Sequence, residues 1–73
     1  MIGMLTGTIT IINSSSMVVD VHGVGYLVRV TSRLMSQLKP GTKATLFIHT
    51  HVQDDAIDLY GFSDEEELAL FKL

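Results

Sequence analysis

The sequence predicts an all-β fold, a small closed barrel of five strands with one short helical connection and the start of a helix near its C-terminal end. Apolar and polar residues alternate along most of the chain, with the two-residue period of half-buried strands. Clusters of turn-forming residues separate these segments at short intervals. The chain has 73 residues, which limits it to one domain. A barrel suits strands this short, because closure removes the exposed edges of an open sheet.

Three strands are expected in the first part of the chain. They are Met4–Ile12, Met17–Val21 and Tyr26–Val30, with turns at Asn13–Ser16 and His22–Gly25. In the first strand, Gly7, Ile9 and Ile11 alternate with threonines and are predicted to share one face. In the third, Leu27 and Arg29 are predicted to point away from the face that the other residues form.

The second part of the chain is predicted to form a helical turn and then a hairpin. Residues Thr31–Gly41 have apolar side chains at helical spacing, a threonine or serine as a possible N-cap, and Lys-Pro-Gly as a stop. The strands Lys43–Gln53 and Ala56–Phe62 follow, with Asp54 and Asp55 at the tip between them. This size and order of elements match the OB-fold, a five-stranded Greek-key barrel. A fold of this kind carries no function by itself.

The stretch SDEEELALFKL, residues 63–73, has the pattern of a helix start. Ser63 followed three residues later by Glu66 is a capping-box signature, and the acidic residues suit the positive end of a helix. A helix this short is marginal alone, since isolated helices need about 12–15 residues. We therefore expect a barrel domain over residues 1–62 and, over residues 63–73, the start of a helix in a chain that is the N-terminal part of a longer protein.

Charge and composition exclude several classes of protein. The net charge is −3, and no two of the five lysines and arginines are adjacent. Because nucleic-acid affinity depends largely on cations at phosphates, these residues alone predict weak binding to DNA. The chain has no cysteine, hence no disulfide or thiolate zinc site. Its apolar runs are far shorter than the roughly 20 residues that span a bilayer, so we expect a soluble, cytoplasmic protein without membrane contact.

The candidate catalytic and metal-binding residues give weak signals. His49 and His51 lie two apart on a predicted strand and share a face, and His22 is a third possible ligand. A metal site needs at least three converging ligands, which the spacing does not supply, so we predict neither a metal nor another cofactor. The segment GVGY lacks the third glycine and the following helix of a phosphate-binding loop. No catalytic nucleophile is indicated.

Asp54 and Asp55 are the feature that most needs an explanation. They place two like charges side by side in a chain that is already acidic. Neighbouring strand residues point to opposite sides, so only a turn would let both carboxylates face one substrate. From the residues alone, a solvated turn is the favoured interpretation, because aspartate is common in turns. A catalytic pair, a cation site and a device that repels another negative group remain open.

Three motifs, in register along the whole chain, resemble a known family. They are MIG.L.G at the start, V.GVGY.V.V in the middle, and DDA..LYGF before the acidic helix start. Together they are similar to the RuvA N-terminal domain family, whose members act in branch migration of Holliday junctions. The family's N-terminal domain is an OB-fold barrel, which agrees with the strand count. One such motif alone would carry little weight, but the three in order are specific.

The resemblance implies a role for the aspartate pair. RuvA-like proteins form homotetramers that hold a four-way DNA junction open, and each subunit projects an acidic pin toward the crossover. The pin's acidic residues fall on Asp54 and Asp55. Other members can have Glu-Asp here, so Asp-Asp keeps both charges and shortens one side chain. The role implied is steric and electrostatic, not catalytic.

The resemblance also implies partners and a division of labour. Most DNA contacts would come from helix-hairpin-helix motifs in a second domain, whose first helix starts in residues 63–73, so this chain alone should bind four-way junctions weakly. In the longer protein, a RuvB-type hexameric ATPase and a RuvC-type resolvase would be partners in recombination, DNA repair and the SOS response. Two alternatives remain: a generic OB-fold module that binds single-stranded nucleic acid or oligosaccharide, and a small metal-dependent enzyme that uses His49, His51 and Asp54.

Overall fold

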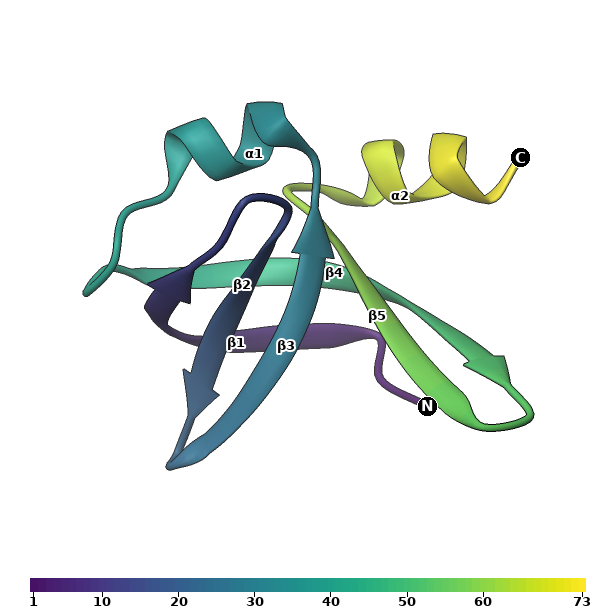
Figure 1. Ribbon diagram of the computed structural model, residues 1–73. Helices are drawn as coiled ribbons and strands as arrows, with labels where there is room; N and C mark the ends of the chain where they lie inside the picture. The colour runs from purple at the N-terminus through teal and green to yellow at the C-terminus, as the bar shows by residue number, and fades with distance from the viewer.

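The computed structural model describes all 73 residues, as five strands and two short helices (Figure 1). The elements in chain order are β1 (Met4–Ile12), β2 (Ser16–Val21), β3 (Val24–Val30), α1 (Ser32–Gln37), β4 (Lys43–Gln53), β5 (Ala56–Phe62) and α2 (Glu65–Lys72). Three of the predicted strands, β1, β4 and β5, have the predicted bounds. The other two begin earlier than predicted, β2 by one residue and β3 by two.

The five strands close into a barrel in the order β1-β2-β3-β5-β4. Every neighbouring pair is antiparallel except β3 and β5, which run parallel over three paired residues, Val28–Val30 with Leu59–Gly61. Helix α1 connects β3 to β4, as a short helical connection was predicted to do. This architecture confirms the predicted all-β, OB-fold-like barrel.

The barrel interior is filled by aliphatic side chains from all five strands. Ile9, Met17, Val19 and Val28 are fully buried, and Leu46 almost so. Leu34 of α1 covers one end of this cluster. Only ten hydrophobic residues are buried in all, so each of them contributes a large share of the stability of so small a domain.

A β-bulge in β1 contradicts one sequence expectation. Ile9 pairs with Val19, but Ile11 pairs with Val18, so Thr10 is an extra residue between the two pairs. A bulge shifts the alternation of side chains by one residue. Ile9 is therefore buried, whereas Ile11 points outward and is 53 % exposed. The prediction that Gly7, Ile9 and Ile11 share one face was wrong at Ile11.

The turn between β2 and β3 is tighter than predicted. It consists of His22 and Gly23, whose φ angles of 52° and 90° both lie in the left-handed region. Such angles match the twist of a two-residue hairpin, and glycine adopts them without strain. The backbone N–H of Gly23 donates to the Asp20 carboxylate at 2.8 Å. Gly25, which was predicted to lie in the turn, is instead a strand residue.

Each helix begins at a capping side chain. The Thr31 hydroxyl accepts a hydrogen bond from the Leu34 N–H at 3.1 Å and caps α1. In α2 the cap is Asp64, whose carboxylate accepts from the Glu67 N–H at 2.8 Å. The predicted capping box of Ser63 and Glu66 was therefore wrong by one position. Glu67, not Glu66, reaches back to Ser63 and bonds its N–H and hydroxyl groups.

Candidate functional site

The hairpin of β4 and β5 extends beyond the barrel as a two-stranded arm. Strand β4 pairs with β1 only as far as Phe47, and β5 pairs with β3 only from Leu59 onward. Just beyond Phe47, β4 still bonds the residues before β1, through the Ile48 N–H to the Gly3 carbonyl and through the Thr50 hydroxyl to Ile2. From His51 and Asp58 down to Gln53 and Ala56 the two strands pair only with each other. Figure 1 shows this arm leading away from both helices.

Asp54 and Asp55 form the tip of the arm, as the sequence predicted. They are the two residues between the paired Gln53 and Ala56, and both are exposed. A turn of this kind lets both carboxylates project into the same region of solvent. The arm contains no lysine or arginine, so the tip is a locally negative end.

The other aspartates of the chain have partners, which sets the tip apart. The carboxylates of Asp20 and Asp64 each accept a backbone N–H at a turn or a helix start. Asp58 lies 3.8 Å from Arg29, in the one ion pair of the structure. Asp54 and Asp55 take part in no ion pair and no side-chain hydrogen bond within the chain. Local structure therefore explains the first three aspartates and leaves the tip unexplained.

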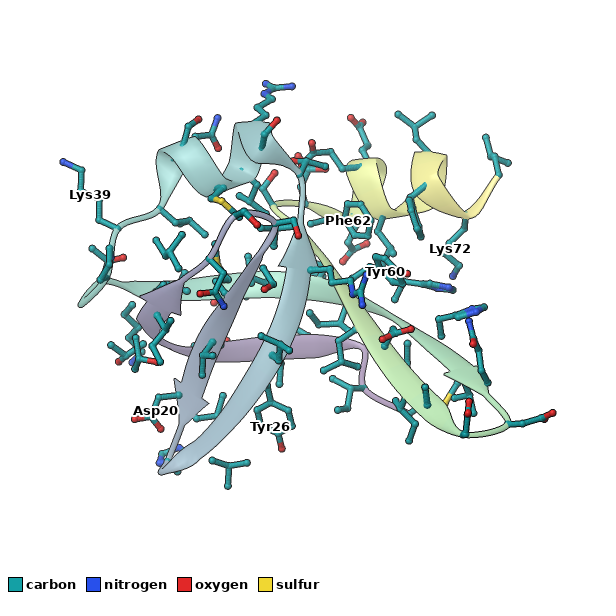
Figure 2. All side chains as sticks on the ribbon, in the orientation of Figure 1. Asp20, Tyr26, Lys39, Tyr60, Phe62 and Lys72 are labelled. Atoms are coloured by element: carbon teal, nitrogen blue, oxygen red, sulfur yellow. The ribbon has the colours of Figure 1, made fainter.

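A cluster of aromatic rings packs α2 against the outside of the barrel. Phe71 of α2 lies 4.9 Å from Phe62, 5.3 Å from Tyr60 and 5.5 Å from His49, measured between ring centroids. His49 and Tyr60 are paired across β4 and β5. Figure 2 shows Tyr60 and Phe62 on the side of the barrel that faces α2. No pattern in the sequence predicts this contact, because only the fold brings these residues together.

The aromatic cluster and its surroundings argue against the two alternative functions, a binder of single strands or oligosaccharide and a metal-dependent enzyme. Its rings pack on one another and only Phe71 among them is as much as 49 % exposed, whereas a binder of single strands presents several exposed rings for bases to stack on. The cavity of about 220 Å³ beside the cluster is lined by one cation, Arg29. The rings of His49 and His51 are 6.4 Å apart, and His49 packs against Phe71 and Tyr60. No three histidine, aspartate or glutamate side chains gather as a metal-binding group.

Replacing Phe71 by alanine is expected to release α2 from the barrel and to leave the barrel folded. The helix has eight residues and buries none of them fully, so it depends on the ring contacts. We expect a local loss of about 1–2 kcal/mol, the order of a few aromatic contacts. Hydrogen exchange of the α2 amides measures it. Leu70→Ala, which removes a residue that is 70 % exposed, is the control; equal acceleration in both variants would contradict the prediction.

Comparison with known proteins settles the family. The family model described as the RuvA N terminal domain matches residues 1–61. The chain belongs to the RuvA N-terminal domain family. The match covers the barrel, the arm and its tip, and agrees with the three sequence motifs that predicted it.

Relatives from several organisms carry the same name. The chain is 48 % identical over 71 residues to the "Holliday junction branch migration complex subunit RuvA" of Maricaulis maris, covering 97 % of this chain and 33 % of the relative. It is 46 % identical to the protein of that name from Xanthobacter autotrophicus and 42 % to that from Chlorobaculum tepidum, over the whole chain and 36 % and 37 % of those relatives. The chain thus spans about a third of the length of the curated relatives it matches.

The RuvA-type barrel has no membrane-spanning helix. Neither α1 nor α2 is long and apolar enough to cross a bilayer.

Proposed function

We propose that this chain is the oligomerisation and acidic-pin module of a RuvA-type protein that holds four-way DNA junctions open for branch migration. The observation that carries the proposal is the unpartnered pair Asp54 and Asp55 at the end of a projecting arm. The names of the relatives, each a subunit of a Holliday junction branch migration complex, supply the DNA structure concerned.

The pin acts through repulsion, not through bond chemistry. Carboxylates placed near DNA phosphates raise the free energy of any arrangement that brings the two together. A continuous duplex laid over the tip would bring its phosphates onto the aspartates, whereas an open junction leaves a gap at its centre. Repulsion that acts against one DNA form and spares another produces selectivity. In a tetramer four such tips would act together.

The low positive charge of the chain is consistent with another domain of the longer protein making most of the DNA contacts. A net charge of −3 gives little affinity for phosphate. Most contacts to DNA would therefore be made by another domain of the longer protein, which begins in residues 63–73 with α2. ATP hydrolysis belongs to a partner of the RuvB type, and resolution of the junction to a partner of the RuvC type. The module itself is not an enzyme and needs no cofactor.

Asp54→Asn with Asp55→Asn in the full-length protein tests the proposal. Binding to a synthetic four-way junction and to a plain duplex is measured at one fixed salt concentration, because salt alone changes such affinities. We expect duplex binding to tighten by roughly tenfold relative to junction binding, since exposed charge pairs contribute about 0.2–1 kcal/mol each and several act together.

The matched control is Glu65→Gln with Glu66→Gln, which removes the same charge from α2. If the control changes duplex binding equally, the effect is one of net charge and the pin is rejected. If the aspartate variant leaves both affinities unchanged, Asp54 and Asp55 form only a solvated turn.

A further inference from the structure

The residues that precede β1 lie against the base of the arm (Figure 1). The Ile48 N–H donates to the Gly3 carbonyl at 2.8 Å. Two residues further along β4, the Thr50 hydroxyl accepts from the Ile2 N–H at 3.2 Å and donates to the Ile2 carbonyl at 2.7 Å. One side chain thus bonds both backbone groups of Ile2, as the backbone of a neighbouring strand would do. Ile2, Gly3 and Thr50 are here called the brace.

The brace lies at the last point where the barrel holds the arm. Thr50 pairs with Leu59 across the hairpin, and Leu59 pairs with Val28 of β3. On the other side of the hairpin, the Ile2 side chain packs against the hydrophobic core. The base of the arm is therefore attached to the barrel on both sides, by the β3 ladder on one and by the brace on the other.

Thr50 is the one polar residue in the inward-facing row of β4. Alternation along the strand places Leu46, Ile48, Thr50 and Val52 on this side, and the first two are buried. Thr50 is half-buried, and a hydroxyl at such a position needs hydrogen-bond partners. Valine has the same shape and would pack in this row without needing any. Packing alone therefore does not explain the hydroxyl, whereas its two bonds to Ile2 do.

We propose that Thr50 is a positioning residue for the pin, because its bonds to Ile2 fix the direction in which the arm projects Asp54 and Asp55. This inference rests on the proposed function, in which the aspartates act by their placement. Four residues of strand separate Thr50 from the tip, which makes a lever of about 13 Å, so a tilt of about 10° at the base would move the tip by about 2 Å. Repulsion between charges depends on their separation, so such a shift would change the repulsion of a nearby phosphate.

Thr50→Val in the full-length protein tests whether the brace holds the arm. Valine keeps the shape of the side chain and removes both hydrogen bonds to Ile2. Hydrogen exchange followed by mass spectrometry should show exchange about tenfold faster in residues 48–58, the factor expected for the loss of two such bonds. Unchanged exchange would overturn the brace.

Thr45→Val is the matched control. The Thr45 hydroxyl lies 2.9 Å from that of Thr6, in a hydrogen bond between the same two strands. This bond lies on the barrel wall, where β1 and β4 are paired, so its loss should leave exchange in the arm as in the wild type. Thr50→Ser keeps the hydroxyl at the base of the arm and should restore slow exchange there. Fast exchange in the serine variant would show that the methyl group holds the arm, and would overturn the proposal.

DNA binding tests whether the brace positions the pin. Thr50→Val is expected to tighten duplex binding relative to junction binding by about threefold, a part of the effect of neutralising both aspartates. Thr50→Ser should keep the wild-type ratio. In the background of Asp54→Asn with Asp55→Asn, Thr50→Val should have no effect on this ratio, because no charge is left to be positioned.

The outcomes separate the brace from the pin. Faster exchange with an unchanged binding ratio would overturn the positioning role of Thr50 and leave the pin standing. An equal effect of Thr50→Val without the aspartates would also overturn it, because Thr50 would then act on DNA by another route. If neutralising the aspartates has no effect of its own, the pin is rejected and the positioning role with it.

Discussion

Gly7→Ala is expected to destabilise the barrel by about 3 kcal/mol, the upper part of the usual range for overpacking. A Cβ atom at Gly7 would press on the carbonyl oxygen of Asp20, closer than Cβ atoms approach any neighbour, and would lie 3.0 Å from Cγ2 of Val21. The neighbour is backbone of β2, which cannot move without disturbing its pairing with β3. A domain of this length has a total stability of roughly 4–11 kcal/mol, so the substitution removes a large part of it.

Urea denaturation measures this loss, and Gly3→Ala is the matched control. Gly3 has nothing within 4 Å of the position where a Cβ would be added. The control should therefore unfold at a midpoint close to that of the wild type. Equal midpoints for Gly7→Ala and Gly3→Ala would mean that β1 and β2 can separate at little cost, which would contradict the close approach of Gly7 to the Asp20 carbonyl.

Ile9→Ala should cost about 2–5 kcal/mol, whereas Ile11→Ala should cost less than 1 kcal/mol. The two residues have the same side chain and lie two positions apart in one strand. The bulge buries the first completely and turns the second outward. The first substitution leaves a cavity among Met17, Val19 and Val28, and the second leaves only solvent.

Denaturation at low protein concentration compares the two isoleucine variants, because self-association would add stability that depends on concentration. Similar losses for both variants would show that β1 alternates without interruption. The bulge would then be rejected.

The strands could be predicted because their signals are local. Alternation along Lys43–Gln53 and Ala56–Phe62, interrupted by two aspartates, determines both strands and the turn between them. The bulge has no such local signal. The N–H of Ile9 donates to the Thr42 carbonyl at 2.8 Å, and the Ile9 carbonyl accepts from the Gly41 N–H at 2.6 Å. These partners lie far away in sequence. Alternation alone therefore predicts, wrongly, that Ile11 points into the barrel as Ile9 does.

The position of the aspartate pair at the hairpin tip could be predicted from the sequence, but the contacts around it could not. The sequence places Asp54 and Asp55 at a tip, but it does not reveal that the other aspartates have partners and these two have none. Arg29 and Asp58 meet only because β3 and β5 are neighbours in the barrel. The position of α2 likewise depends on the contact of Phe71 with His49 and Tyr60. These residues belong to three different elements, so the spacing of apolar residues within any one element does not predict the contact.

The short parallel ladder between β3 and β5 has a consequence for the order of folding. It joins only three residues of each strand, and along the chain α1 and all of β4 lie between them. The β2–β3 and β4–β5 hairpins need much shorter loops to close. They lose less chain entropy on closing, so they form first. The ladder between β1 and β4 joins residues still farther apart in sequence, but it has five residue pairs to stabilise it. We therefore expect the three-pair ladder of β3 and β5 to form late, after the rate-limiting step. Weakening it should speed unfolding while leaving the refolding rate almost unchanged.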